Sequence, residues 1–177
     1  MTDSELQQKR LIAAAIDIAV AVAIGVVFAV GAAAFGFMAG RSGSVALGYV
    51  MRVLGVLGAL VSVGYILARD VVAGGSSIGK KTQGLRVVTA SGAAAGAMDS
   101  VKRNAPFAIG SLLGLLSALL QLVPCLGDAV ACLLAPLTWL GYLVGLAAAV
   151  IEIVKIVTDA EGVRIGDGLA GTRVVRG

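Results

Sequence analysis

Residues 78–88 read Ile-Gly-Lys-Lys-Thr-Gln-Gly-Leu-Arg-Val-Val, and residues 165–175 read Ile-Gly-Asp-Gly-Leu-Ala-Gly-Thr-Arg-Val-Val. The two segments align without a gap, and we call them the first motif and the second motif. Each motif follows a pair of long apolar stretches. The chain is therefore predicted to be one membrane domain, 1–177, built from two copies of one unit at 1–88 and 89–177.

The composition is that of a membrane protein. The chain has 177 residues, of which 59% are hydrophobic and 14% charged, and its mean hydropathy is +1.00. A soluble domain needs more charge to cover its surface, and apolar residues gathered in long blocks are typical of membrane spans. We therefore predict an all-α membrane protein with four transmembrane helices, arranged as two parallel-repeat hairpins with a short cytoplasmic β-strand motif after each. The spans are expected at residues 11–38, 45–68, 106–123 and 129–157.

The basic residues predict the orientation of the chain in its membrane. Of the 14 lysines and arginines, Arg41 lies between the first two spans, Arg52 lies inside the second, and all the others lie on the side of the N-terminus. Lys and Arg concentrate in cytoplasmic loops, so both termini and the segment between the hairpins are expected in the cytoplasm. There the basic residues would face anionic lipid headgroups, and no nucleic-acid partner is expected.

Pairs of small residues four positions apart recur in the spans and favour close helix packing. They are Gly36 with Gly40, Gly110 with Gly114, and Gly141 with Gly145. Such pairs serve packing within one chain or between copies. A homo-oligomer is expected, because four spans make a thin wall around any pathway.

Asp17 is a charge that the first span must accommodate. It follows Arg10 by seven residues on the same helical face and lies roughly 9 Å into the span by helical rise, where an unpaired charge is costly. Its expected partners are Arg10, Lys155 near the inner end of the fourth span, or water, and Glu152 is expected in the same polar cluster. Two interpretations stay open: Asp17 binds a cation or proton, or it forms a structural ion pair. Arg52 is expected to extend outward to the membrane surface, with a counter-charge role as the alternative.

The two motifs are expected to be structural. Their final Arg-Val-Val contains β-branched residues, which favour short strands, and these strands would pair with each other and pack on the helix ends. Asp167 is expected to cap or brace the turn of the second motif. The motif residues with a predicted structural role are Gly79, Lys80, Gly84, Arg86, Asp167, Gly171 and Thr172. Residues 74–80 nearly match a phosphate-binding loop, but Lys81 stands where that loop requires a hydroxyl, so a glycine turn is the preferred interpretation.

No catalytic or cofactor chemistry is expected. The chain has no His to activate a serine, and two Cys without His offer too few ligands for a metal ion. Cys125 and Cys132 are expected to be free thiols in an apolar setting. We therefore predict a protein that is not an enzyme and that binds no cofactor.

Several segments, in the same order along nearly the whole chain, resemble the RDD family of bacterial membrane proteins, which is named for one arginine and two aspartates. The matching segments are residues 10–17, 77–80, 84–88, 103–104, 166–172 and 174–175. By position, Arg10 matches the family arginine and Asp17 the first aspartate, while Asp167 matches the second aspartate better than Asp70 does. The resemblance implies the four-span topology and a location in the bacterial inner (plasma) membrane. Some members are proposed to exchange sodium, lithium or potassium for protons, so the resemblance also implies such exchange as an activity.

Three functions follow as hypotheses. The first is a cation/proton antiporter that moves Na⁺ or K⁺ against H⁺, with Asp17 as the titrating group of a dimer or larger assembly. The second is a non-transporting membrane scaffold or accessory subunit, whose Lys80, Lys81 and Arg173 dock a cytoplasmic protein partner or anionic lipid. The third is a module that binds a membrane lipid or small molecule between its spans.

Overall fold

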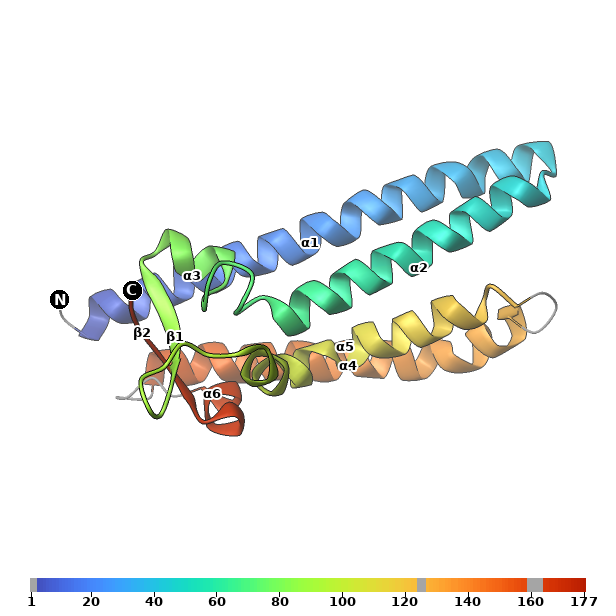
Figure 1. Cartoon of the computed structure of the whole chain (residues 1–177). Helices are drawn as coiled ribbons and strands as arrows, with labels where there is room; N and C mark the ends of the chain where they lie inside the picture. The colour runs from blue at the N-terminus through green and yellow to red at the C-terminus, as the bar shows by residue number, and fades with distance from the viewer. Residues whose placement is uncertain (1–2, 124–126, 159–163) are drawn as a thin grey trace.

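Four long helices and a small cap of short helices and strands make up the described part of the chain (Figure 1). The computed structural model describes residues 3–123, 127–158 and 164–177. In chain order, its elements are α1 (Asp3–Ser42), α2 (Val45–Ala68), α3 (Ile78–Thr82), β1 (Leu85–Thr89), α4 (Ala97–Leu120), α5 (Gly127–Thr158), α6 (Ile165–Ala170) and β2 (Thr172–Arg176).

The long helices are apolar enough to cross a membrane. Among the described residues there are four such helices, which confirms the predicted number of spans. They are Glu5–Ser42, Val45–Ala68, Ala97–Leu120 and Cys132–Thr158. Many of their large apolar side chains face outward: Val27 is 70% exposed and Leu133 is 76% exposed. Such a surface suits lipid rather than water.

The helices extend beyond the apolar segments that mark them in the sequence. α1 begins before and ends after the expected span 11–38, and α4 begins at Ala97 rather than at residue 106. The apolar segment predicted as the third span therefore begins inside α4, because hydropathy marks only the lipid-facing part of a helix. The polar first turn of α4 is capped by Asp99, which accepts the Gly96 N–H at 2.9 Å. Pro106 therefore lies inside α4.

Glycines bring the long helices into close contact. A Cβ added at Gly110 of α4 would lie 2.5 Å from the backbone nitrogen of Tyr142 in α5. A Cβ added at Gly58 of α2 would lie 2.6 Å from the Cβ of Phe28 in α1. Gly110, from one of the predicted small-residue pairs, thus packs α4 on α5 within the chain, whereas a Cβ at Gly40 would meet nothing within 4 Å.

The two motifs meet in a small antiparallel sheet. Strands β1 and β2 pair with Val87 opposite Val174. Val87 is 0% exposed, and Leu85 and Val174 form a buried cluster with Ala13 of α1. The sheet therefore joins the second motif to the first and both to α1, at the end of the molecule where the two termini lie (Figure 1).

Arg52 joins α2 to α4 at the opposite end of the molecule. Its Nη1 donates to the carbonyl oxygen of Gln121 at 2.7 Å, and its guanidinium lies 5.9 Å from the ring centroid of Tyr49. Gln121 is the C-cap of α4, where backbone carbonyls lack helical partners and attract positive charge. The side chain thus extends away from the motif end and stabilises a helix terminus.

Candidate functional site

The end of the molecule that carries the motifs has a polar interior. Arg103, Asn104 and Asp70 are at most 1% exposed. Other buried polar or charged side chains in this region are Asp17, Ser77, Lys80, Ser100, Glu152, Arg164 and Asp167. A buried charge is costly unless it is paired and hydrogen-bonded, so the partners of these groups explain how the region is built.

Asp17 holds the N-terminus of α3 against α1. Its Oδ2 accepts the Ser77 hydroxyl at 2.5 Å, and its Oδ1 accepts the Gly79 N–H at 2.8 Å. Ser77 and Gly79 lie at the start of α3, where backbone N–H groups have no helical acceptor. A Cβ added at Gly79 would overlap the carbonyl oxygen of Ala13, so only glycine lets α3 approach α1 this closely.

The partners expected for Asp17 have other positions. Arg10 donates to the carbonyl oxygen of Val174 in β2 at 2.8 Å, and Lys155 is exposed on α5. The expectation rested on countercharges placed along the spans. In the structure α3 folds back onto α1, and its neutral hydroxyl and amide groups donate to the carboxylate instead.

Glu152 holds α6 in the same way. Its Oε1 accepts the Gly166 N–H at 3.1 Å, and its Oε2 accepts from Nη1 of Arg164 at 3.3 Å. In the alignment of the two motifs, Gly166 corresponds to Gly79 and Arg164 to Ser77. A Cβ added at Gly166 would overlap the backbone of α4. Each motif is thus anchored by a carboxylate from a long helix, which is α1 for the first motif and α5 for the second.

Six buried charges of alternating sign join the two motifs, and we call them the charge chain. In order, they are Lys80, Asp70, Arg103, Asp167, Arg164 and Glu152. Lys80 contacts Asp70, and the next four N–O distances along the chain are 3.4, 2.8, 3.2 and 3.3 Å. Each inner member has opposite charges on both sides, and their attraction offsets part of the cost of burial.

Asp70 is a fully buried member of the charge chain with several donors around it. Besides the Lys80 ammonium, it accepts from Nδ2 of Asn104 at 3.0 Å and lies 3.4 Å from Nε of Arg103. Burial alone would raise the pKa of Asp70, but the charges of Lys80 and Arg69 and the hydrogen bonds from Lys80 and Asn104 hold that pKa below its usual range. Burial lowers the pKa of Lys80, against the attraction of Asp70. Asp70 is therefore ionised at neutral pH.

Three members of the charge chain were not predicted as site residues from the sequence. They are Asp70, Arg103 and Arg164. One signal was available: Arg103-Asn104 precedes an apolar segment of the same helix, and charges so close to a span need partners. The partners themselves lie far away in the sequence, so no local pattern identifies them.

Gly84 and Gly171 end the short helices at equivalent positions of the two motifs. Their φ angles are +64° and +61°, in the left-handed region that favours glycine. Asp167 caps α6, because its Oδ2 lies 3.2 Å from the backbone nitrogen of Arg164, the N-cap residue, and accepts that N–H. Of the other predicted motif residues, Arg86 is exposed and Thr172 is buried.

A cavity of about 200 Å³ lies among the four long helices beside the charge chain. Its polar lining consists of Arg10, Asp17, Tyr65, Arg69, Lys80, Glu152 and Arg164. Its apolar lining includes Ile18, Ile66, Phe107 and Ile153, one from each long helix. Four basic groups and two carboxylates therefore face one space with mostly apolar walls. Arg10, Asp17 and Glu152 all belong to this lining, and Lys155 does not.

Metal coordination finds no support in the described residues. They contain no group of three or more His, Cys, Asp or Glu placed to hold a metal ion. Cys132 is a free, exposed thiol, and Cys125 lies outside the described residues.

One protein family resembles this chain over most of its length. No curated protein and no solved structure matches the chain. The model of the RDD family matches residues 7–171, a range that holds the charge chain, both carboxylate anchors and the cavity lining except Val174 of β2. Because the match covers most of the chain, this protein belongs to the RDD family.

Proposed function

We propose that this RDD protein is a non-enzymatic scaffold or accessory subunit of the bacterial inner membrane, with both termini and both motifs in the cytoplasm. Its role would be to dock a cytoplasmic protein or anionic lipid on the motif end. The observation that carries the proposal is the charge chain, which fixes both motifs to the helix ends and to each other. A binding surface carried by rigid elements keeps its geometry, which favours specific recognition.

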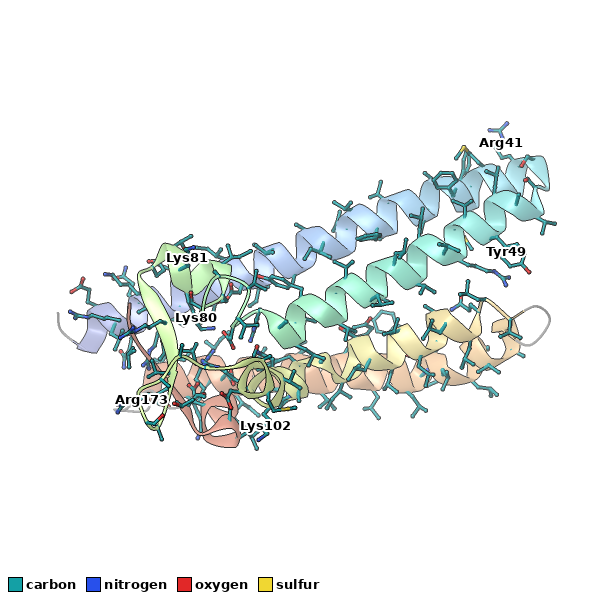
Figure 2. All side chains as sticks on the ribbon, in the orientation of Figure 1. Arg41, Tyr49, Lys80, Lys81, Lys102 and Arg173 are labelled. Atoms are coloured by element: carbon teal, nitrogen blue, oxygen red, sulfur yellow. The ribbon has the colours of Figure 1, made fainter. Side chains whose placement is uncertain are left out.

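Exposed basic residues supply the docking surface. Lys81 lies in the first motif, Arg173 in the second and Lys102 in α4, and all three are exposed. Lys80, which was also expected to dock a partner, is instead buried against Asp70. The three exposed residues lie toward the end that holds the termini, whereas Arg41 lies at the opposite end (Figure 2). Basic groups beside a span are attracted to the anionic cytoplasmic leaflet, so the motif end is the end that we assign to the cytoplasm.

The equivalent anchoring of the two motifs supports the parallel repeat. Each hairpin would start and end on the cytoplasmic side, with the pseudo-axis along the membrane normal. The open space beside Gly40 in α1 leaves that small residue available for packing against a second copy, which supports a homo-oligomer.

Cation/proton exchange is the second candidate function, and one observation favours it. Asp17 of α1 and Glu152 of α5 face the same cavity, as expected of two carboxylates that share Na⁺, K⁺ or H⁺. Asp17, however, is hydrogen-bonded by Ser77 and Gly79. Exchange would therefore require α3 to release this carboxylate in every cycle, and docking requires no such step.

Site-specific photo-crosslinking in intact bacteria tests the docking proposal. A crosslinker at position 81 or 173 is expected to capture a defined protein or an anionic lipid, because both positions are exposed on the motif end. The same crosslinker at position 41, which is also exposed but lies at the opposite end, is the matched control. The variant Asp70→Asn should reduce capture at both motif positions. Equal capture from all three positions, or none from 81 and 173, would refute the proposal.

A further inference from the structure

We infer that the cavity binds the phosphate of an anionic phospholipid, whose acyl chains lie along the apolar side of the cavity. This assignment deepens the docking function proposed above and rests on it. It names the ligand class and places the ligand between the helices rather than on the exposed basic surface.

Arg164 presents an unused donor in the cavity lining. The residue is 8% exposed, its Nε donates to Asp167 and its Nη1 donates to Glu152. Its Nη2 is buried and has no hydrogen-bond partner among the described residues. A buried donor without an acceptor is costly and rare, and guanidinium groups bind phosphate oxygens through such N–H groups. An anion in the cavity would satisfy this donor.

Tyr65, which also lines the cavity, carries a second unused donor. Its hydroxyl is buried on α2 and lacks a partner in the part of the chain that the structure describes, and the residue lines the cavity. Buried tyrosine hydroxyls usually find a hydrogen-bond partner. The two unsatisfied donors come from α2 and from the residue before α6, and both residues line the same cavity.

The charge of the lining favours an anion. Arg69 is a basic lining residue outside the charge chain. Its Nε donates to Oδ1 of Asn104 at 2.8 Å, and its guanidinium lies 5.5 Å from the ring centroid of Phe107, so neither of these partners carries a charge. The carboxylates Asp17 and Glu152 already accept hydrogen bonds from the starts of α3 and α6. A positive charge in an apolar space attracts an anion more strongly than the same charge in water would.

The apolar walls favour a lipid over a soluble anion. Ile18, Val22 and Ile153 line the cavity and are also 47%, 58% and 41% exposed. The wall therefore continues onto the outer surface of α1 and α5, where acyl chains would lie. The volume of about 200 Å³ is below the roughly 300–1,000 Å³ of sites that enclose a whole drug-sized ligand. The cavity thus suits a phosphate and its glycerol, with the chains left in the bilayer.

Native mass spectrometry of the full chain in detergent tests the assignment, with phosphatidylglycerol and phosphatidylcholine added in turn. The wild type is expected to retain phosphatidylglycerol and to release phosphatidylcholine. Tyr65→Phe removes a hydroxyl that has no partner among the described residues, and it should weaken retention about fivefold, as for one neutral hydrogen bond. Arg164→Lys loses the forked guanidinium and should weaken retention about tenfold. Arg41→Gln removes an exposed charge at the opposite end of the molecule and is the matched control, which should retain the lipid. Lys81→Gln and Arg173→Gln remove exposed charges of the docking surface outside the cavity, and they distinguish the two locations of the lipid.

The outcomes separate this inference from the docking function. Loss of lipid in Lys81→Gln and Arg173→Gln, with retention in Tyr65→Phe, would place the lipid on the exposed surface, so docking would stand and the cavity assignment would fail. No retention of phosphatidylglycerol by the wild type would also overturn the assignment, and docking would then depend on a protein captured by crosslinking. Displacement of the lipid by glycerol phosphate at equal concentration would identify a soluble phosphate as the ligand and overturn the lipid. If Arg164→Lys fails to fold, Tyr65→Phe alone decides.

Discussion

Replacing Asp70 with asparagine should destabilise the protein strongly, although the two side chains have the same shape. The change removes the negative charge that lies between Lys80 and Arg103. Removal of one partner from a buried ion pair leaves an uncompensated charge and costs about 3–5 kcal/mol of unfolding free energy. Asp70 is 0% exposed and Lys80 5% exposed, so solvent screening should not reduce this figure, as it does for surface pairs.

Unfolding of the purified protein in mixed micelles, with increasing denaturing detergent, measures this loss. The fluorescence of Trp139, the single tryptophan, reports the transition. Glu5→Gln is the matched control, because it removes an exposed carboxylate whose partner Lys9 is 3.7 Å away and also exposed. This control should change the unfolding free energy by no more than about 0.5 kcal/mol.

A double variant refines the same test. Asp70→Asn combined with Lys80→Gln should lose less stability than the two single changes added together, because the second change removes the uncompensated ammonium. A loss below about 1 kcal/mol for Asp70→Asn alone, or strict additivity of the two changes, would refute the reasoning that the buried charges hold one another.

Three further predictions concern packing and pH. Gly79→Ala should lower the unfolding free energy by about 1–3 kcal/mol, because its methyl group would overlap the Ala13 carbonyl oxygen. Gly168→Ala, whose methyl group would meet nothing within 4 Å, should be tolerated. Limited proteolysis of the first motif should distinguish the two variants. Gly110→Ala should loosen α4 from α5, since its Cβ would lie 2.5 Å from the α5 backbone, and an unchanged midpoint of thermal unfolding would contradict this. The lowered pKa of Asp70 means that its stabilisation is complete above its unfolded pKa of about 3.9 and is lost as the pH falls through the lower folded value. The unfolding free energy should therefore decline in acid, and Asp70→Asn should remove that part of the decline.

The number of spans was predictable because each long apolar helix appears in the sequence as a long apolar segment. The beginning of α4 was not, since Ala97 to Asn104 is polar enough to read as a loop. That segment continues the helix beyond the apolar region, and its buried side chains, Ser100, Arg103 and Asn104, contact other polar groups rather than lipid. Hydropathy carries no information about such a segment.

The partners within the site were the least predictable part. Asp17 and Gly79 are 62 residues apart in the sequence, and a backbone N–H can donate whatever the residue type. A search for countercharges along the spans therefore suggested Arg10 and Lys155, with water as the remaining candidate. The Ile-Gly repeat did identify Gly79 and Gly166, whose tight packing explains why both motifs begin with the same pair. The two motifs also differ in charge, because the equivalent positions Lys80 and Asp167 carry opposite charges.

Sodium- and potassium-driven proton movement in proteoliposomes tests the central claim most directly, with the wild type beside Asp17→Asn. The claim is that Asp17 is a structural acceptor that holds α3, and asparagine keeps an oxygen for the Gly79 N–H while it removes the titrating group. The account predicts no cation-dependent flux above empty liposomes for correctly oriented wild type, and an Asp17→Asn variant that remains folded. Cation-dependent flux in the wild type that is lost in folded Asp17→Asn would contradict the account and identify an exchanger.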